Sequence, residues 1–388
     1  MSGSLVALLL AASTAVAAHA FVIWLRWVLD QPSDGQWWWA MLPAAGGAVA
    51  IGVVAASRTT AATADAFVYG MQRNVLTGSG APARFAALIC GVGLGVPLGY
   101  EGPMVYFGGV VGAVGGAPIG RRLGSGRRSA MLACATAGVA MVIGAPVAAA
   151  LFTTEIMRRG WPRAVEREGL VIGAVAAWLV RRSLGERGGV VGVPPAVATG
   201  SVMIGALVIG VVGGLAGRAF AGAIIRSKLA RWSVGTRLVV VPVTLVTAVT
   251  AGRVASGEWI YVGSGDRLLE WARSAAAGWV VVATIVFAAL VLTMVAGGVV
   301  GGLFLPLVSL GGATGLVLTR SWVPGVSPAV AVGIGGCALL ASGYGTPLAA
   351  VAVGVSTFGV GAAGLAAAVA VGVAAAIGRG ATASLHRR

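Results

Sequence analysis

Apolar stretches recur from one end of this chain to the other, and each is long enough to cross all or part of a lipid bilayer. A helix needs ~20 mostly apolar residues to span the hydrocarbon core. Only 10% of the residues are charged, whereas a soluble domain carries about 25%. A surface so poor in charge cannot face water over most of its area. The pattern therefore predicts an integral membrane protein with many helices and no large soluble domain.

Glycine and proline interrupt the apolar stretches at residues 97–99, 144–146, 301–302 and 346–347 and at Pro306. Proline removes a backbone donor and clashes inside a helix. Broken backbone inside a membrane is tolerated only where protein buries it or where it lines a cavity. Short, broken segments in matching places of two halves indicate a transporter built from inverted repeats.

The two halves of the chain repeat the same order of parts. Gly-Ala-Pro at 144–146 follows an Ala- and Gly-rich segment late in the first half, and Gly-Thr-Pro at 345–347 does so late in the second. Pro103 and Pro306 likewise each follow a glycine-containing turn and open a predicted helix. We therefore predict an all-α, polytopic integral membrane protein with two inverted-topology helical repeats and broken helices.

The first repeat is expected at residues 1–190 and the second at residues 191–388. The stretch from Ser4 onward reads as the first membrane helix rather than a cleaved leader, because it runs on without a break and has no basic start. The net charge is +16, and the arginines cluster in short segments between apolar stretches. This placement follows the positive-inside rule, so the segment after Glu155 and the C-terminus are expected in the cytoplasm, and no nucleic-acid partner is expected.

The cysteines and histidines show no spacing typical of a metal site or a disulfide framework. Cys90, Cys134 and Cys337 lie singly inside apolar stretches, and His19 and His386 are isolated near the ends. No metal, no cofactor and no enzymatic activity are therefore expected.

Glu101 is the strongest candidate for a functional side chain. It stands among apolar residues in Leu-Gly-Tyr-Glu-Gly-Pro at 98–103, and an ionisable group at membrane depth is costly and marks function by default. Pro103 favours the first turn of a helix, whose free amides and positive dipole end form an anion site. A carboxylate there can occupy the site and leave it to a mobile anion when protonated or displaced. The alternative is a glutamate that only caps its own helix.

A second turn, Gly-Gly-Leu-Phe-Leu-Pro at 301–306, has the same character. Its glycines free the backbone to expose consecutive amides. The amides around Leu303 and Phe304 can bind an anion as a nest, with Phe304 as an apolar wall. The alternative for this turn is helix packing alone.

Three motifs together resemble the CLC family of chloride channels and transporters. They are Gly-Tyr-Glu-Gly-Pro at 99–103, Gly-Ala-Pro-Val-Ala-Ala-Ala-Leu-Phe-Thr-Thr-Glu at 144–155, and the turn at 301–306, in the family's order. The resemblance covers nearly the whole chain. It implies a homodimer in the plasma membrane, with one anion pathway per subunit, multiple membrane passes and no cytoplasmic regulatory domain. It also implies that Glu101 is the gating glutamate. The anion-binding residues drawn from this resemblance are Gly99, Tyr100, Gly102, Leu303 and Phe304.

One further anion ligand in the family is the serine hydroxyl of a Gly-Ser-Gly-Ile-Pro motif. Ser79 lies in a similar segment, but it is much closer to Glu101 than the family's spacing, and we interpret it as part of a loop. The segment Thr63-Ala64-Asp65 has the better spacing. There Thr63 is expected to offer its hydroxyl to the anion, with Ala64 beside it, and Asp65 is expected to cap a helix.

Two parts of the proton-coupled members are missing. Those members carry a glutamate directly after the one that matches Glu155, and here that position is Ile156. They also carry a tyrosine near the last helix that reaches the central anion, and residues 381–383 contain none. Glu155 is interpreted as a structural carboxylate near Arg158 and Arg159. A substitute proton relay is the alternative role for Glu155.

The predicted function is transmembrane transport of chloride or a similar small anion, with the lipid bilayer as the surrounding partner. The missing inner glutamate favours a channel-like or weakly proton-coupled conductor. Four alternatives remain: a proton/chloride antiporter with a non-standard proton path, a fluoride transporter, a non-transporting membrane scaffold, and a cation-coupled solute transporter. The last would need more buried carboxylates than Glu101 alone.

Overall fold

The computed structural model describes residues 3–30, 37–73, 75–116, 126–157, 162–186, 200–323, 325–359 and 361–382. All regular secondary structure in these ranges is helical, and the prediction of an all-α protein is confirmed. The elements are α1 (Gly3–Asp30), the 3-10 turn η1 (Trp37–Ala40), α2 (Met41–Ala56), α3 (Thr63–Arg73), α4 (Ala81–Gly91), the 3-10 turn η2 (Val92–Leu94), α5 (Glu101–Gly115), α7 (Gly126–Ile143), α8 (Pro146–Met157), α9 (Ala164–Ser183), α10 (Gly200–Leu229), α11 (Val234–Ser256), α12 (Asp266–Ala272), α13 (Ala277–Gly297), α14 (Phe304–Ser321), α15 (Pro328–Leu339), the π-helical turn η3 (Leu340–Tyr344), α16 (Pro347–Phe358) and α17 (Ala362–Thr382).

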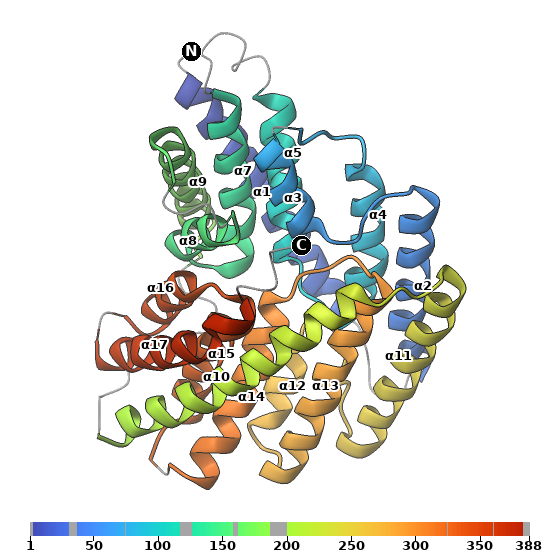
Figure 1. Cartoon of the computed structure of the whole chain (residues 1–388), viewed down its shortest axis with the longest axis vertical. Helices are drawn as coiled ribbons and strands as arrows, with labels where there is room; N and C mark the ends of the chain where they lie inside the picture. The colour runs from blue at the N-terminus through green and yellow to red at the C-terminus, as the bar shows by residue number, and fades with distance from the viewer. Residues whose placement is uncertain are drawn as a thin grey trace.

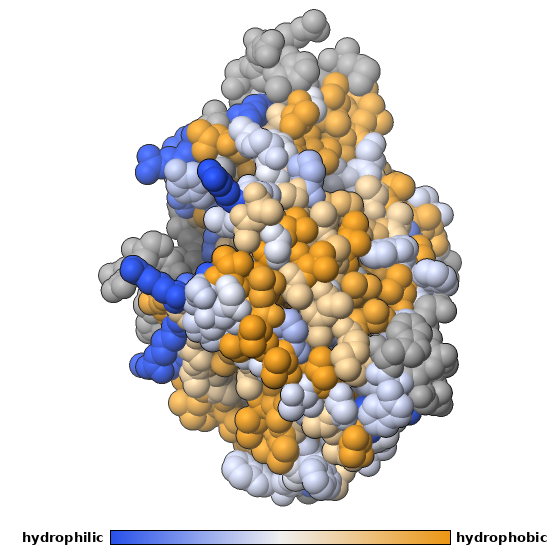
Figure 2. Space-filling model, turned by 90° about the vertical axis from the view of Figure 1, so that its right-hand side faces the viewer, coloured by the Kyte–Doolittle hydropathy of each residue, from blue (hydrophilic) through white to orange (hydrophobic). Residues whose placement is uncertain are grey.

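Five of the described helices, α1, α10, α11, α13 and α14, are long and apolar enough to cross a membrane. Large apolar side chains are exposed along α1, α10, α11 and α13, among them Val239 and Val243 on α11 and Val282 and Ile285 on α13. Figure 2 shows apolar side chains spread across the middle of one face, with strongly hydrophilic ones gathered along an edge. Such a surface fits contact with a membrane, and together with the five helices long enough to span it it identifies a multi-pass membrane protein.

The helices before and after the middle of the chain gather in different parts of the molecule (Figure 1). α7 packs against α1, α5 and α9, while α10 packs against α17 and α14 against α15. The two groups meet where α2 lies beside α11 and where α8 lies beside α16. The starts of α5 and α14 also meet each other, where Glu101 contacts Phe304.

Close backbone approach holds α5 to α7 and α14 to α15. A Cβ added to Gly108 of α5 would overlap the Cys134 carbonyl oxygen of α7, and one added to Gly311 of α14 would overlap the Gly335 carbonyl oxygen of α15. Small residues at such crossings let membrane helices pack without a hydrophobic driving force. This packing accounts for the glycines at these two crossings.

Several helices begin and end within the protein, at the Gly and Pro interruptions. α7 ends at Ile143, Gly144 takes a left-handed conformation with φ of 72°, and Pro146 opens α8. Gly345 likewise takes a left-handed conformation, with φ of 77°, and Pro347 opens α16. Glycine adopts this conformation without the steric cost that a side chain would bring. The predicted broken helices are therefore present, and their ends expose free backbone amides inside the protein.

Candidate anion site

Glu101 is the first residue of α5, and its side chain is fully buried. Its Oε1 accepts a hydrogen bond from the backbone N–H of Phe304, the first residue of α14. The carboxylate thus lies at the N-terminus of a helix about two hundred residues further along the chain. Helix N-termini bind anions through free amides and the positive end of the dipole. The side chain therefore occupies a position suited to a free anion.

The turns that precede α5 and α14 are hydrogen-bonded to each other. The Gly99 N–H donates to the Gly302 carbonyl over 2.9 Å, and the Gly302 N–H donates to the Gly99 carbonyl over 2.6 Å. A Cβ added at either glycine would overlap the carboxylate of Glu101. Glycine at both positions is what lets the carboxylate lie between the two turns.

Thr63, at the start of α3, lies next to this pair of turns. A Cβ added to Gly102 would be 3.5 Å from Thr63 Oγ1 and 3.6 Å from Ala64 Cβ. Thr63 is 1% exposed, and its hydroxyl has no hydrogen-bond partner within the described residues. A buried hydroxyl without a partner costs about 1–3 kcal/mol. The hydroxyl of Thr63 is therefore an unused hydrogen-bond donor close to the first turn of α5.

Aromatic rings form one wall of the site. Phe304 is fully buried, and its ring meets that of Phe152 on α8 edge to face, with centroids 5.3 Å apart. Phe152 also contacts Tyr344 of η3, at 5.5 Å between centroids. Phe152 and Tyr344 were not predicted as neighbours of Phe304 from the sequence. Phe152 lies inside one of the three motifs, which is the only signal that could have singled it out.

The structure brings Glu101, Gly99, Gly102, Leu303 and Phe304 together, with Thr63 and Ala64 alongside. Leu303 immediately precedes α14. The ring of Tyr100, also predicted at the site, packs against Phe21 of α1, with centroids 6.2 Å apart. Ser79 is exposed and bonded to the hydroxyl of Thr77, as expected for a loop residue.

Asp65 and Glu155 also carry predictions from the sequence. Asp65 was expected to cap a helix, but it lies within the first turn of α3 and its carboxylate receives a hydrogen bond from Lys228 of α10 over 2.7 Å. Glu155 lies away from Glu101, where both its oxygens accept backbone N–H groups at the start of α16. Arg158 and Arg159, its predicted neighbours, lie outside the described residues.

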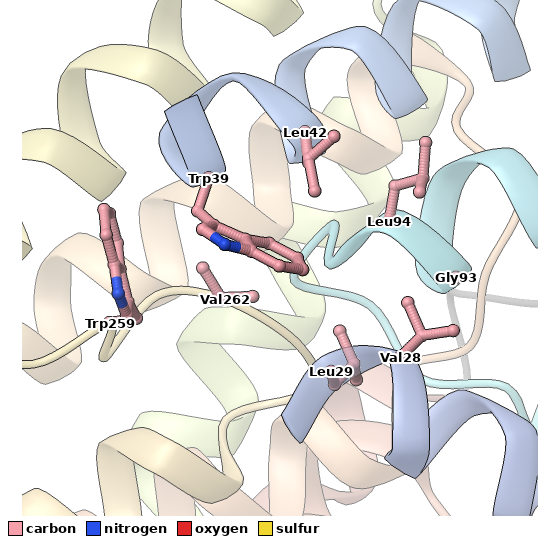
Figure 3. A pocket seen from close by; sticks show the side chains of 8 residues that line it. All are labelled: Val28, Leu29, Trp39, Leu42, Gly93, Leu94, Trp259 and Val262. Carbon is pink, nitrogen blue, oxygen red and sulfur yellow. The ribbon is translucent and has the colours of Figure 1, made fainter. Parts of the chain in front are cut away.

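An apolar pocket occurs elsewhere in the molecule (Figure 3). Its walls are Val28, Leu29, Trp39, Leu42, Gly93, Leu94, Trp259 and Val262. These residues include neither Glu101 nor Thr63 nor Phe304, and they offer almost no polar surface to an ion. No cluster of three or more metal-ligating side chains occurs in the described part of the chain.

Three solved structures share the fold. A slow cyanobacterial Cl⁻/H⁺ antiporter matches with a TM-score of 0.78 at 18% identity, covering 99% of this chain and 97% of that one. A CLC-type fluoride/proton antiporter matches with a TM-score of 0.74 at 19% identity, covering 97% and 95%. A eukaryotic CLC transporter matches with a TM-score of 0.75 at 14% identity, covering 97% and 72%.

The comparison with curated proteins found no match. The family model described as voltage gated chloride channel matches residues 61–379. That range contains Thr63, Glu101, Glu155 and Phe304, and it covers most of the 388 residues. The family match and the shared fold support anion transport. The chain is a member of the voltage-gated chloride channel, or CLC, family.

Proposed function

We propose that this protein transports chloride or a similar small anion through a pathway gated by Glu101. The observation that supports this most directly is the hydrogen bond between the Glu101 carboxylate and the Phe304 amide. The carboxylate and a mobile anion would compete for the same helix N-terminus, because both are stabilised by the same amide and dipole.

Transport then follows from the chemistry of the site. When Glu101 is protonated or swings away, the anion takes its place beside the Phe304 amide and the Thr63 hydroxyl, with Leu303 and the Phe304 ring as apolar walls. Backbone amides and a hydroxyl replace part of the anion's water. No cationic side chain in the described part of the chain bonds to the Glu101 carboxylate, so anion binding would stay weak enough for release.

The conductor is channel-like or weakly coupled to protons. The proposal rests on Ile156, an apolar residue that follows Glu155 and cannot carry a proton. Two of the structural neighbours are antiporters of chloride or fluoride against protons, so antiport through another proton path is the second candidate. Anion efflux from proteoliposomes, with external pH recorded, separates the two. A channel-like conductor gives anion efflux with no coupled proton flux. An antiporter moves protons into the vesicles as the anion leaves.

Anion efflux from proteoliposomes also tests whether Glu101 gates the pathway. Glu101→Gln is expected to raise chloride flux at neutral pH and to abolish its pH dependence, because the side chain can no longer exchange its charge. In the wild type, flux should rise as pH falls, because protonation removes the competing carboxylate. Glu270→Gln, at an exposed carboxylate of α12, is the control. Wild-type flux and pH dependence in Glu101→Gln would contradict the proposal and favour another pathway, whereas no flux from the wild type would favour a non-transporting scaffold.

The proposal extends to the oligomeric state of the protein. We propose a homodimer in the plasma membrane, with one anion pathway in each subunit. Each subunit comprises two inverted halves, at residues 1–190 and 191–388. Support comes from the family membership and from the matching breaks before α8 and α16.

A further inference from the structure

The N-terminus of α16 is capped by a residue from another helix. Thr346 is the N-cap residue, Pro347 is N1, and the next two backbone N–H groups are those of Leu348 and Ala349. In most helices the side chain of an N-cap threonine accepts one of these two N–H groups. Here Glu155 of α8 accepts both, the Leu348 N–H at Oε1 and the Ala349 N–H at Oε2, each over 2.8 Å.

Thr346 has consequently lost the bond that its position would normally provide. Its side chain makes no capping hydrogen bond, the residue is fully buried, and no described group pairs with its hydroxyl. Burying a hydroxyl without a hydrogen-bond partner is destabilising. Two charge-assisted bonds to the Glu155 carboxylate offset that cost. The start of α16 thus has two rival caps, its own Thr346 and the carboxylate of α8.

The capped helix start connects directly to the anion site. Phe152 precedes Glu155 by three residues on α8, so the two side chains lie on neighbouring positions of one helix face. The Phe152 ring contacts Phe304, whose amide binds Glu101, and also Tyr344, which lies just before Thr346. Any shift of α8 relative to α16 would therefore move the ring that packs against the anion site.

We propose that Glu155 is a positioning residue: by capping α16 in place of Thr346, it holds α8 against α16 and so fixes Phe152 against Phe304. Thr346 is the substitute cap, which accepts a free N–H group when Glu155 releases it. This inference rests on the proposed function, since Phe304 is taken to bind the anion. It also gives Glu155 a role that requires no proton transfer.

A double-mutant cycle tests the rival caps without any transport measurement. The variants are Glu155→Ala, Thr346→Val and the double substitution, in the full-length protein in detergent, with thermal unfolding as the readout. Thr346→Val alone should leave stability unchanged or raise it, because valine has the same shape without the unpaired hydroxyl. Glu155→Ala should destabilise the Thr346→Val variant more than the wild type, because threonine can take over the cap and valine cannot. Additive effects would overturn the inference.

Chloride binding tests the link to the anion site. In a Glu101→Gln background, where the gate no longer competes, Glu155→Gln should weaken chloride affinity several-fold in isothermal titration, because one of its two amide bonds is lost. Ser356→Ala on α16, whose hydroxyl bonds within its own helix, is the control and should bind as the parent does. Unchanged affinity in Glu155→Gln would remove the link between the cap and the site.

The failures of the two proposals are distinguishable. If Glu155 does not position the site, the cycle is additive and chloride affinity is unchanged, while Glu101→Gln still alters flux. If the gate assignment is wrong, Glu101→Gln leaves flux unchanged, while the caps of α16 still couple in the cycle. Because Glu155→Gln retains one acceptor, it provides a milder variant should Glu155→Ala not fold.

Discussion

Glu101 takes its position from the residues on either side of it in space rather than in sequence. Gly99 and Gly302 have no Cβ to occupy the volume of the carboxylate, and the Phe304 amide provides its hydrogen bond. A buried carboxylate without such a partner would be strongly destabilising. The proposed function places a small anion at this position, where the same three features would accommodate it once the carboxylate has left.

Thr63 offers a test at the scale of one atom. Thr63→Val keeps the shape of the side chain and removes the hydroxyl, which has no partner within the described residues. A hydrogen bond to a charged group contributes about 1.5–3 kcal/mol, so chloride affinity should fall about tenfold or more, while thermal stability should be unchanged or slightly higher. Isothermal titration and thermal unfolding give the two readouts. Thr63→Ser should restore affinity, and full affinity in Thr63→Val would exclude the hydroxyl as a ligand.

At the scale of elements, the helix pairs depend on close backbone contact. Gly335→Ala should destabilise the protein by about 1–3 kcal/mol, because its Cβ would overlap the Gly311 carbonyl oxygen and push α15 from α14. Thermal unfolding in detergent measures the loss. Gly222→Ala on α10 is the matched control: its Cβ would meet nothing within 4 Å, so it should be neutral or slightly stabilising through helix propensity. Equal effects at both positions would contradict this account of the packing.

The sequence predicted some elements of the site and not others, for physical reasons. Glu101 and the turn at Phe304 stood out because ionisable or glycine-rich segments are conspicuous among apolar helices. The extent of α3 was missed, because Thr63–Arg73 is short and carries Asp65 and Arg73 among its few apolar residues. The α16 cap could not be predicted, because Glu155 and its partners are 193 and 194 positions apart and only the packing of α8 on α16 brings them together.

At the scale of the whole molecule, lipid is the solvent that the fold requires. Ile285 lies near the middle of α13 with its side chain exposed. Ile285→Arg should impair membrane insertion, since an arginine at the centre of a spanning helix costs about 2.5–3.5 kcal/mol. The yield in the membrane fraction and the elution profile after extraction measure the effect. Glu270→Arg, at an exposed position of the short helix α12, should accumulate normally, and equal yields of the two variants would place Ile285 outside the bilayer.

In the proposed mechanism, the carboxylate of Glu101 competes with an anion for the N-terminus of α14. A crystal structure of Glu101→Gln grown in bromide tests it most directly, because bromide scatters anomalously and stands in for chloride. We expect a bromide peak within hydrogen-bond distance of the Phe304 amide and the Thr63 hydroxyl. A structure with bromide bound elsewhere, and none beside Phe304, would contradict it.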